Sequence, residues 1–214
     1  DLDRGELLAA MRTAGLPAVV VDVWTREMSV DTVVQDSFMG GLLAGEHLAA
    51  RGVQRPGWLG AEFIGGDLQI VERYAGAAGA LWRAGLSLAP ELAVRTPLGN
   101  LDLARERARE LLARRPGAVL TLWQEMTAAL VSAAREAGQV PGRDFGMVGW
   151  STREAYASGF RPQFGAGPVP PCVTWSIEEM AGAALRLLRM RRAEPAAPPM
   201  HVRIPAMLTA GTPD

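Results

Sequence analysis

The chain has 214 residues, of which 49% are hydrophobic, and its 22 basic and 23 acidic side chains give a net charge of −1. This composition is typical of a soluble globular protein with a real core and argues against nucleic-acid binding by these residues alone. No apolar run reaches the roughly 18 residues of a membrane helix, no signal peptide is visible, and the single cysteine, Cys172, excludes an internal disulfide, so we expect a cytoplasmic protein.

Helices and strands alternate along the chain, as judged from hydrophobic spacing, glycine stops and capping residues. The expected elements, in chain order, are a helix ended by Gly15, strands at 18–23 and 32–35, a helix at 38–51, a strand at 56–60, a helix through Val71, Tyr74, Ala75, Ala78 and Trp82, a strand at 92–95, a helix capped by Asn100, a strand at 118–123, a helix from Met126 to Gly138, a strand at 145–150, a helix from the Ser176–Glu179 capping box to about Met190, and strands at 201–205 and 206–209. The segments 160–171 and 193–199 are rich in proline, glycine and alanine, and we expect surface loops there. Such alternation predicts an α/β fold with parallel sheets and right-handed crossovers.

The segment Val33–Gly60 is the most informative part of the sequence. It predicts a strand end, a polar corner at Gln35-Asp36, a helix and a second strand. Within that helix, Gly41 and Gly45 share one face with Ala44 and Leu48, so the face carries few side-chain atoms. We expect this small face to let the helix lie close to the sheet.

This segment resembles the subdomain crossover of the lactose-repressor/galactose-repressor (LacI/GalR) family of bacterial transcription regulators. The matching positions are Gln35-Asp36, Gly40-Gly41, His47-Leu48, Gly52 and Gly60. The resemblance covers essentially the whole chain and implies a type I periplasmic-binding-protein-like fold. That fold has two doubly wound parallel-sheet subdomains joined by three crossovers, and the implied bounds are 1–34 with 175–204 for the N-terminal subdomain and 35–173 with 205–214 for the C-terminal one.

The same resemblance implies parts of the family that this sequence does not match. The family's first two strand–helix units are missing from it, so the N-terminal subdomain is expected to be incomplete. The helix-turn-helix head that reads DNA is also not present in this chain. The implied partners are a small-molecule effector, DNA through that head, and a second copy in a homodimer, with no membrane.

Candidate ligand-binding residues follow from a rule for open α/β sheets, in which ligands bind at the carboxyl ends of the strands. Four of the six tryptophans lie at such expected ends, namely Trp24, Trp123, Trp150 and Trp175. Flat aromatic faces with a few polar groups suit a small amphipathic ligand such as a sugar or a nucleoside. The alternative is that these rings only plug the rim of the core.

The resemblance assigns further residues position by position. Asp22 matches an aspartate that follows a strand in sugar-responsive members, and Arg73 in Arg-x-x-Gly matches an arginine that clamps ligand hydroxyls or carboxylates. For Arg73 the alternative is a solvated helix residue. The chain departs from the family at Trp123-Gln124, where the family has Asn-Asp, and at Ser151, where it has Asp.

Ser151 has two readings of equal weight, since it can contact a ligand or cap a helix in a Ser-x-x-Glu box with Glu154. The predicted ligand-binding set is therefore Asp22, Trp24, Arg73, Trp123, Ser151 and Trp175. Because acceptors for sugar hydroxyls are partly replaced, the sequence leaves open an effector that is less hydroxylated, more aromatic or anionic.

The predicted function is the effector-binding and dimerising core of a transcriptional regulator. The small molecule is expected to bind between the subdomains and to control operator affinity. A periplasmic sugar-binding protein of an ABC importer is the first alternative, because it shares the fold. An enzyme is the second, but no nucleophile elbow, phosphate loop or dinucleotide motif is present, and we expect no catalytic residue, cofactor or metal site.

Overall fold

The computed structural model describes residues 4–23, 29–63 and 68–212. The chain forms two compact units, which we describe separately. Unit 1 comprises Asp1–Gln35 and Ser176–Ile204, and unit 2 comprises Asp36–Trp175 and Pro205–Asp214. The chain therefore passes from one unit to the other three times.

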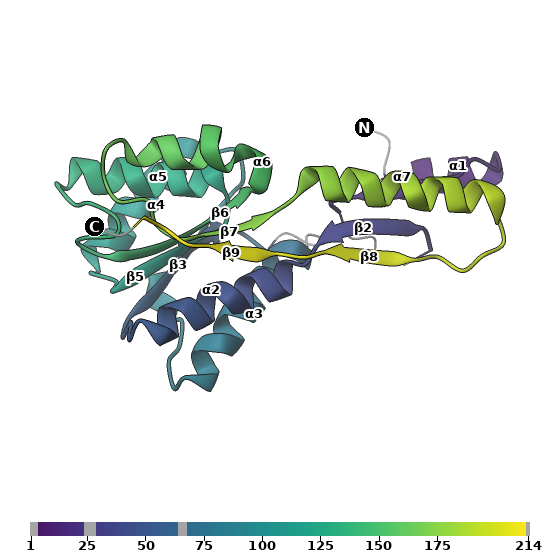
Figure 1. Ribbon diagram of the computed structural model, residues 1–214. Helices are drawn as coiled ribbons and strands as arrows, with labels where there is room; N and C mark the ends of the chain where they lie inside the picture. The colour runs from purple at the N-terminus through teal and green to yellow at the C-terminus, as the bar shows by residue number, and fades with distance from the viewer. Residues whose placement is uncertain (1–3, 24–28, 64–67, 213–214) are drawn as a thin grey trace. The chain divides into compact units, whose positions relative to one another are not determined.

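Unit 1 has a three-stranded parallel sheet in the order β1-β2-β8 (Figure 1). Its elements are α1 (Arg4–Thr13), β1 (Val19–Val21), β2 (Asp31–Gln35), α7 (Ile177–Ala193) and β8 (His201–Ile204). Helix α7 packs on β1 and β2, and every residue of β2 is buried. The central strand of this sheet thus comes from the start of the chain and its neighbour β8 from the end.

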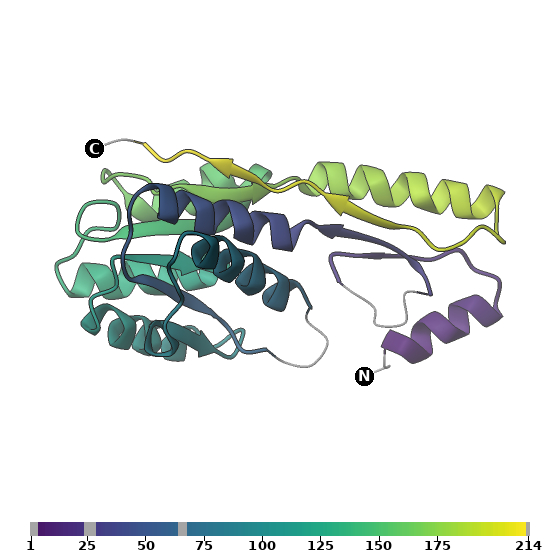
Figure 2. The same ribbon diagram turned by 90° about the horizontal axis from the view of Figure 1, so that it is seen from below.

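Unit 2 has a six-stranded sheet in the order β4-β3-β5-β6-β7-β9, parallel except for β9. Its elements are α2 (Ser37–Ala50), β3 (Pro56–Ala61), α3 (Leu68–Arg83), a short turn at Pro90–Leu92, β4 (Ala93–Thr96), α4 (Leu101–Ala113), β5 (Ala118–Thr121), α5 (Gln124–Glu136), β6 (Gly146–Thr152), α6 (Arg153–Ala155) with helical turns to Phe164, β7 (Cys172–Trp175) and β9 (Met207–Thr209). Helices α2 and α3 cover one face and α4 and α5 the other (Figures 1 and 2). The strand order reverses between β3 and β5, which is where a doubly wound sheet binds ligands.

Capping residues begin the helices where the sequence predicts them, with one exception. The Asn100 side chain accepts from the Leu103 amide at 3.0 Å, and Ser176 Oγ accepts from the Glu179 amide at 3.2 Å. The predicted cap at Ser151 is wrong, because Thr152 Oγ1 accepts from the Ala155 amide instead. Ser151 stays inside β6, since that strand keeps its pairing with β7 as far as Thr152.

Two glycines on the small face of α2, Gly41 and Gly45, contact α3. A Cβ atom at Gly41 would lie 2.1 Å from the Arg73 carbonyl oxygen, and one at Gly76 would lie 2.1 Å from the Phe38 carbonyl oxygen. Gly45 likewise faces the backbone of α3. These two glycines therefore let α2 and α3 approach backbone to backbone, while α2 lies on the sheet through Gly40, where an added Cβ would meet Trp150 and Val173.

The predicted helix through Val71 and Trp82 is present as α3; both side chains are exposed, and the buried face carries Ile70 and Leu81. One expectation needs correction. The segment 160–171 is not simply a surface loop, because Phe160 is fully buried against Val169 and Cys172. Burial raises the pKa of the Cys172 thiol well above its usual range.

No helix within the described ranges combines the length and the hydropathy that a bilayer-spanning segment requires.

Substituting Gly41 by alanine tests the close contact between α2 and α3. Gly41→Ala should lower the free energy of unfolding by about 1–3 kcal/mol, because the added Cβ forces two backbones apart. Gly79→Ala on α3 is the matched control, since a Cβ there meets nothing within 4 Å. The control should be neutral or stabilising by up to about 1 kcal/mol. Equal effects of both substitutions in chemical denaturation would contradict the close approach.

Candidate functional site

A buried arginine lies where the strand order of unit 2 reverses. Arg73, from the second turn of α3, has no exposed surface. Its Nη1 donates to the Leu122 carbonyl at 2.8 Å, and its Nε donates to Ser37 Oγ at 3.4 Å. Arg73 thereby joins the start of α3 to the start of α2 and to the corner after β5. The alternative that it is a solvated helix residue is excluded.

Two indole rings complete the surroundings of Arg73. Its guanidinium carbon lies 3.9 Å from the centre of the Trp123 ring and 4.2 Å from that of Trp150. The Trp150 ring also lies against α2, where a Cβ at Gly40 would come within 2.3 Å of it. A desolvated cation over indole faces gains about 2 kcal/mol per contact. The two rings hold the cation in place and cover it.

The neighbouring polar groups also bind one another. Gln124 Nε2 donates to Ser151 Oγ at 2.8 Å, which links the start of α5 to the end of β6. Thr121 and Thr127 share a buried hydrogen bond of 2.8 Å between their hydroxyls. In contrast, the buried Trp123 Nε1 has no hydrogen-bond partner among the described residues. The edge of unit 2 therefore combines hydrogen-bonded side chains with indole surface.

Unit 1 has its own polar edge at the carboxyl ends of β1 and β2. Asp22 follows β1 with a left-handed backbone (φ 57°), a conformation that aspartate tolerates better than most residues. Its Oδ1 accepts from Gln35 Nε2 at 3.1 Å, and Gln35 is fully buried. Gln35 thus fixes the carboxylate of Asp22.

The structure brings only some of the predicted residues together. Arg73 and Trp123 are in contact, while Ser151 joins them through its bond to Gln124. Trp175 ends β7, where it is largely buried. Trp24 lies outside the described residues. Trp150 was not in the predicted ligand-binding set. Its position at the end of an expected strand was the signal that could have identified it.

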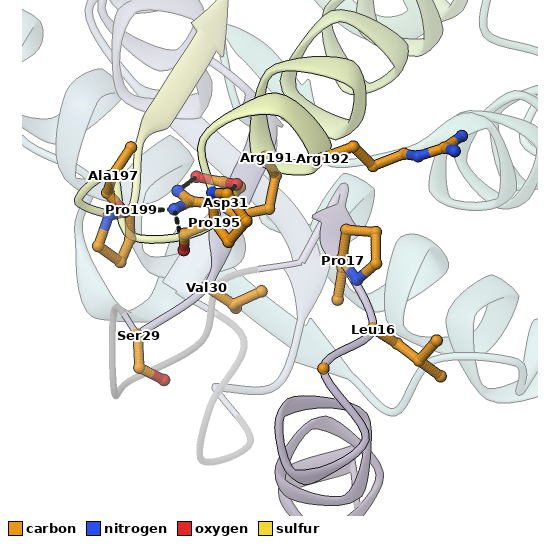
Figure 3. A pocket seen from close by; sticks show the side chains of 12 residues that line it. Leu16, Pro17, Ser29, Val30, Asp31, Arg191, Arg192, Pro195, Ala197 and Pro199 are labelled. Atoms are coloured by element: carbon orange, nitrogen blue, oxygen red, sulfur yellow. Dashed lines mark hydrogen bonds and ion pairs between the residues drawn. The ribbon is translucent and has the colours of Figure 1, made fainter.

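A separate hollow of about 620 Å³ lies in unit 1, at the amino ends of the strands. Its lining comprises Gly15, Leu16, Pro17, Ala18, Ser29, Val30, Asp31, Arg191, Arg192, Pro195, Ala197 and Pro199. Figure 3 shows Arg191 turned onto Asp31 while Arg192 extends away from it. The hollow is mainly apolar, and its most buried polar groups bind one another.

The Asp31–Arg191 pair ties β2 to the end of α7. Arg191 donates from Nε and Nη2 to the two carboxylate oxygens at 2.8 Å each, and the Met200 amide donates to Oδ1 at 2.8 Å. Burial opposes the ionisation of Asp31, but these hydrogen bonds and the charge of Arg191 outweigh it and lower the pKa of Asp31. The remaining donors of Arg191 bind carbonyls of Pro195, Ala197 and Pro198.

The described residues contain no cluster of three or more His, Cys, Asp or Glu that could hold a metal ion.

A family model described as a periplasmic binding protein-like domain matches residues 46–212. The chain belongs to this family. Within the periplasmic binding protein-like domains, a similar sequence is the HTH-type transcriptional repressor PurR of Mannheimia succiniciproducens, which is 31% identical over 137 residues. That alignment covers 63% of this chain and 40% of the repressor, so the chain spans well under half the length of this relative.

Solved structures of similar fold include transcriptional regulators with bound sugars. A LacI family regulator from Enterococcus faecium with bound ribose has a TM-score of 0.83 and 21% identity, covering 99% of this chain and 75% of that one. The regulator CelR in complex with cellobiose has a TM-score of 0.80 and 23% identity, covering 97% and 62%. The expected type I periplasmic-binding-protein-like fold is confirmed, and so is the resemblance to LacI-family regulators.

Replacing Arg73 by lysine tests its role as a buried link. Arg73→Lys keeps the charge, but an ammonium cannot reproduce the planar contacts with two rings while donating to Leu122 and Ser37. The free energy of unfolding should fall by about 1–3 kcal/mol in chemical denaturation. Arg186→Lys, on the exposed face of α7, is the control and should change little. An unchanged stability of Arg73→Lys would refute the link.

Removing Arg191 should leave the buried Asp31 carboxylate uncompensated. Arg191→Leu is expected to cost about 3–5 kcal/mol at neutral pH, whereas Arg107→Ala, in the exposed Arg107–Glu110 pair, should change stability little. Urea denaturation monitored by circular dichroism measures both.

The pH dependence of the same pair has a defined sign. Because the pKa of Asp31 is lowered in the folded state from its ordinary value of 3.8, its contribution is complete above that value. The contribution is lost as the pH falls through the folded pKa. Wild-type stability should therefore drop more steeply below pH 3.8 than that of Asp31→Asn, and parallel curves would show that Asp31 contributes nothing.

Proposed function

We propose that this chain is the effector-sensing and dimerising core of a DNA-binding transcriptional regulator. The sequence match to a repressor and the fold shared with LacI-family regulators support this. The regulator would be a cytoplasmic homodimer. It would bind DNA through a helix-turn-helix head that is not part of this chain. No enzymatic step belongs to the proposal, because the polar groups at the strand ends bind one another rather than forming an ionisable pair.

The effector would bind at the carboxyl edge of the unit 2 sheet, beside Trp123. The observation that carries this is the pair of indoles over Arg73 at the point where the strand order reverses. Asp22, Trp24, Ser151 and Trp175 remain proposed contacts by their positions at strand ends.

The chemistry of this edge favours a planar ring over a neutral sugar. Arg73 is covered, and the amide of Gln124 is engaged by Ser151, so fewer side-chain groups remain to grip sugar hydroxyls. Indole faces stack on flat rings, and the Trp123 side chain is only partly buried. A nucleobase or nucleoside is therefore the preferred class. Sugars are the runner-up, because the CelR and Enterococcus faecium structures contain them.

Control of DNA affinity would follow from a shift in population. An effector changes the balance between two conformations only by the difference in its affinity for them. Leu122 and Trp123 adjoin the Arg73 link to the start of α2, so a ligand that moves the Trp123 ring would act on the first residues after the crossing at Gln35.

A panel of compounds tests the site and the ligand class together. Adenine, guanine and adenosine should raise the melting temperature of the chain, while D-ribose and cellobiose should do so weakly or not at all. A ligand present at 100 times its Kd stabilises the folded state by about 2.7 kcal/mol, which a thermal-shift assay detects. Stabilisation by the sugars alone would overturn the planar-ring preference, and no response to any compound would count against the sensing function.

Tryptophan emission identifies the ring involved. Trp123→Phe should remove most of the ligand-induced change in emission, because the effector is proposed to stack on that indole. Trp82→Phe is the matched control, since Trp82 is 78% exposed on α3, and it should leave the change intact. A change that survives Trp123→Phe would place the ligand elsewhere.

A further inference from the structure

Exposed apolar side chains gather on α2 and α3, and none of them belongs to the predicted ligand-binding set. We define the outer face of α2 and α3 by Phe38, Met39, Leu68, Val71 and Trp82, all exposed, together with the exposed Ala75. The two helices lie side by side in both views (Figures 1 and 2). The exposed apolar residues therefore lie on two helices that contact each other in unit 2.

Such a face is unusual for helices that border solvent. A surface helix normally turns charged residues outward, yet α2 contains only one carboxylate, Glu46, and no arginine. On α3 the outward positions Leu68, Val71, Ala75 and Trp82 form one stripe at helical spacing. This is the stripe whose periodicity in the sequence resembles that of a core-facing helix.

The shape of the stripe is complementary to itself. Its middle projects least from the helix, because Ala75 has a small side chain and Gly79 has none, and a Cβ at Gly79 would meet nothing within 4 Å. Its carboxyl end carries the large Trp82 ring, which is 78% exposed. If a second α3 lies antiparallel across the first, with a two-fold axis near Gly79, each Trp82 faces Ala75 of the other copy. Isologous pairing of this kind is the commonest form of protein self-association.

The charges at the ends of α3 agree with that arrangement. Glu72 lies in the amino-terminal half, and Arg83 is the last residue of the helix. Arg83 already pairs with Glu46 at 3.5 Å, and both side chains are about half exposed or more. An antiparallel copy brings its Glu72 toward Arg83, so attraction is expected at both ends of the contact. A parallel copy would instead bring like charges together.

We propose that the outer face of α2 and α3 is a homotypic docking surface, on which a second copy of this chain lies with its α3 antiparallel. The contact is small, because a 16-residue helix is about 24 Å long. It falls below the roughly 800 Å² per partner of a stable standard-size interface. The association is therefore weak and concentration-dependent, and it adds to any pair formed through another face.

An engineered cysteine near the axis tests the geometry. Gly79→Cys should form disulfide-linked pairs on mild oxidation of the 214-residue chain, in proportion to its concentration, because the axis places the two residues close together. The native Cys172 is fully buried and should not contribute. Leu101→Cys is the matched control, since Leu101 is 49% exposed on α4, which covers the opposite face of the sheet. It should give at least tenfold less linked product.

A second variant separates docking from chance collision. Trp82→Glu in the Gly79→Cys background should reduce the linked product at least tenfold. In sedimentation velocity, Trp82→Glu alone should halve the mass of the largest species, because docked copies separate. Leu101→Glu should leave that species unchanged. Equal linking through Leu101→Cys, or association that is absent or insensitive to Trp82→Glu in a chain with wild-type circular dichroism, would overturn the proposal. Neither result bears on effector binding, which the thermal-shift panel measures separately.

Discussion

A buried positive charge at the point where the sheet reverses constrains the rest of unit 2. The Arg73 guanidinium is removed from water, and its desolvation is offset by the Leu122 carbonyl, the Ser37 hydroxyl and two indole faces. These partners come from elements far apart in sequence. Removing any one of them leaves the cation less compensated, so the start of α2, the corner after β5 and the end of β6 are held together by one side chain.

The same link connects the two proposed surfaces. Arg73 lies on the inner side of α3, and its carbonyl oxygen is the atom against which Gly41 packs. Since α2 and α3 touch through their backbones, few side chains can rearrange between them, and the pair moves as one layer. A displacement of Trp123 by a ligand would thus reach the outer side of that layer, where Trp82 is exposed.

Local sequence signals predict much of the fold, but they predict the candidate site only in part. Strand–helix alternation and the caps at Asn100 and Ser176 depend on neighbours in sequence, so they were predicted correctly. The competing cap at Ser151 failed because the pairing of β6 with β7 decides where the strand ends. The burial of Arg73 could not be derived, because it depends on partners 36 and 49 residues away. The outward face of α3 could not be derived, because α3 carries apolar residues on both sides.

The three passages between the units bear on how this protein is made. Strand β8 completes the sheet of unit 1 by pairing with β2, although Thr32 and His201 are separated by most of the chain. Strand β9 then completes the sheet of unit 2 beside β7. Domains usually fold in turn as they leave the ribosome, but here neither sheet has all its described strands until β8 and β9 are synthesised. Until then both sheets keep an unpaired strand edge during translation, and such an edge can pair with another chain.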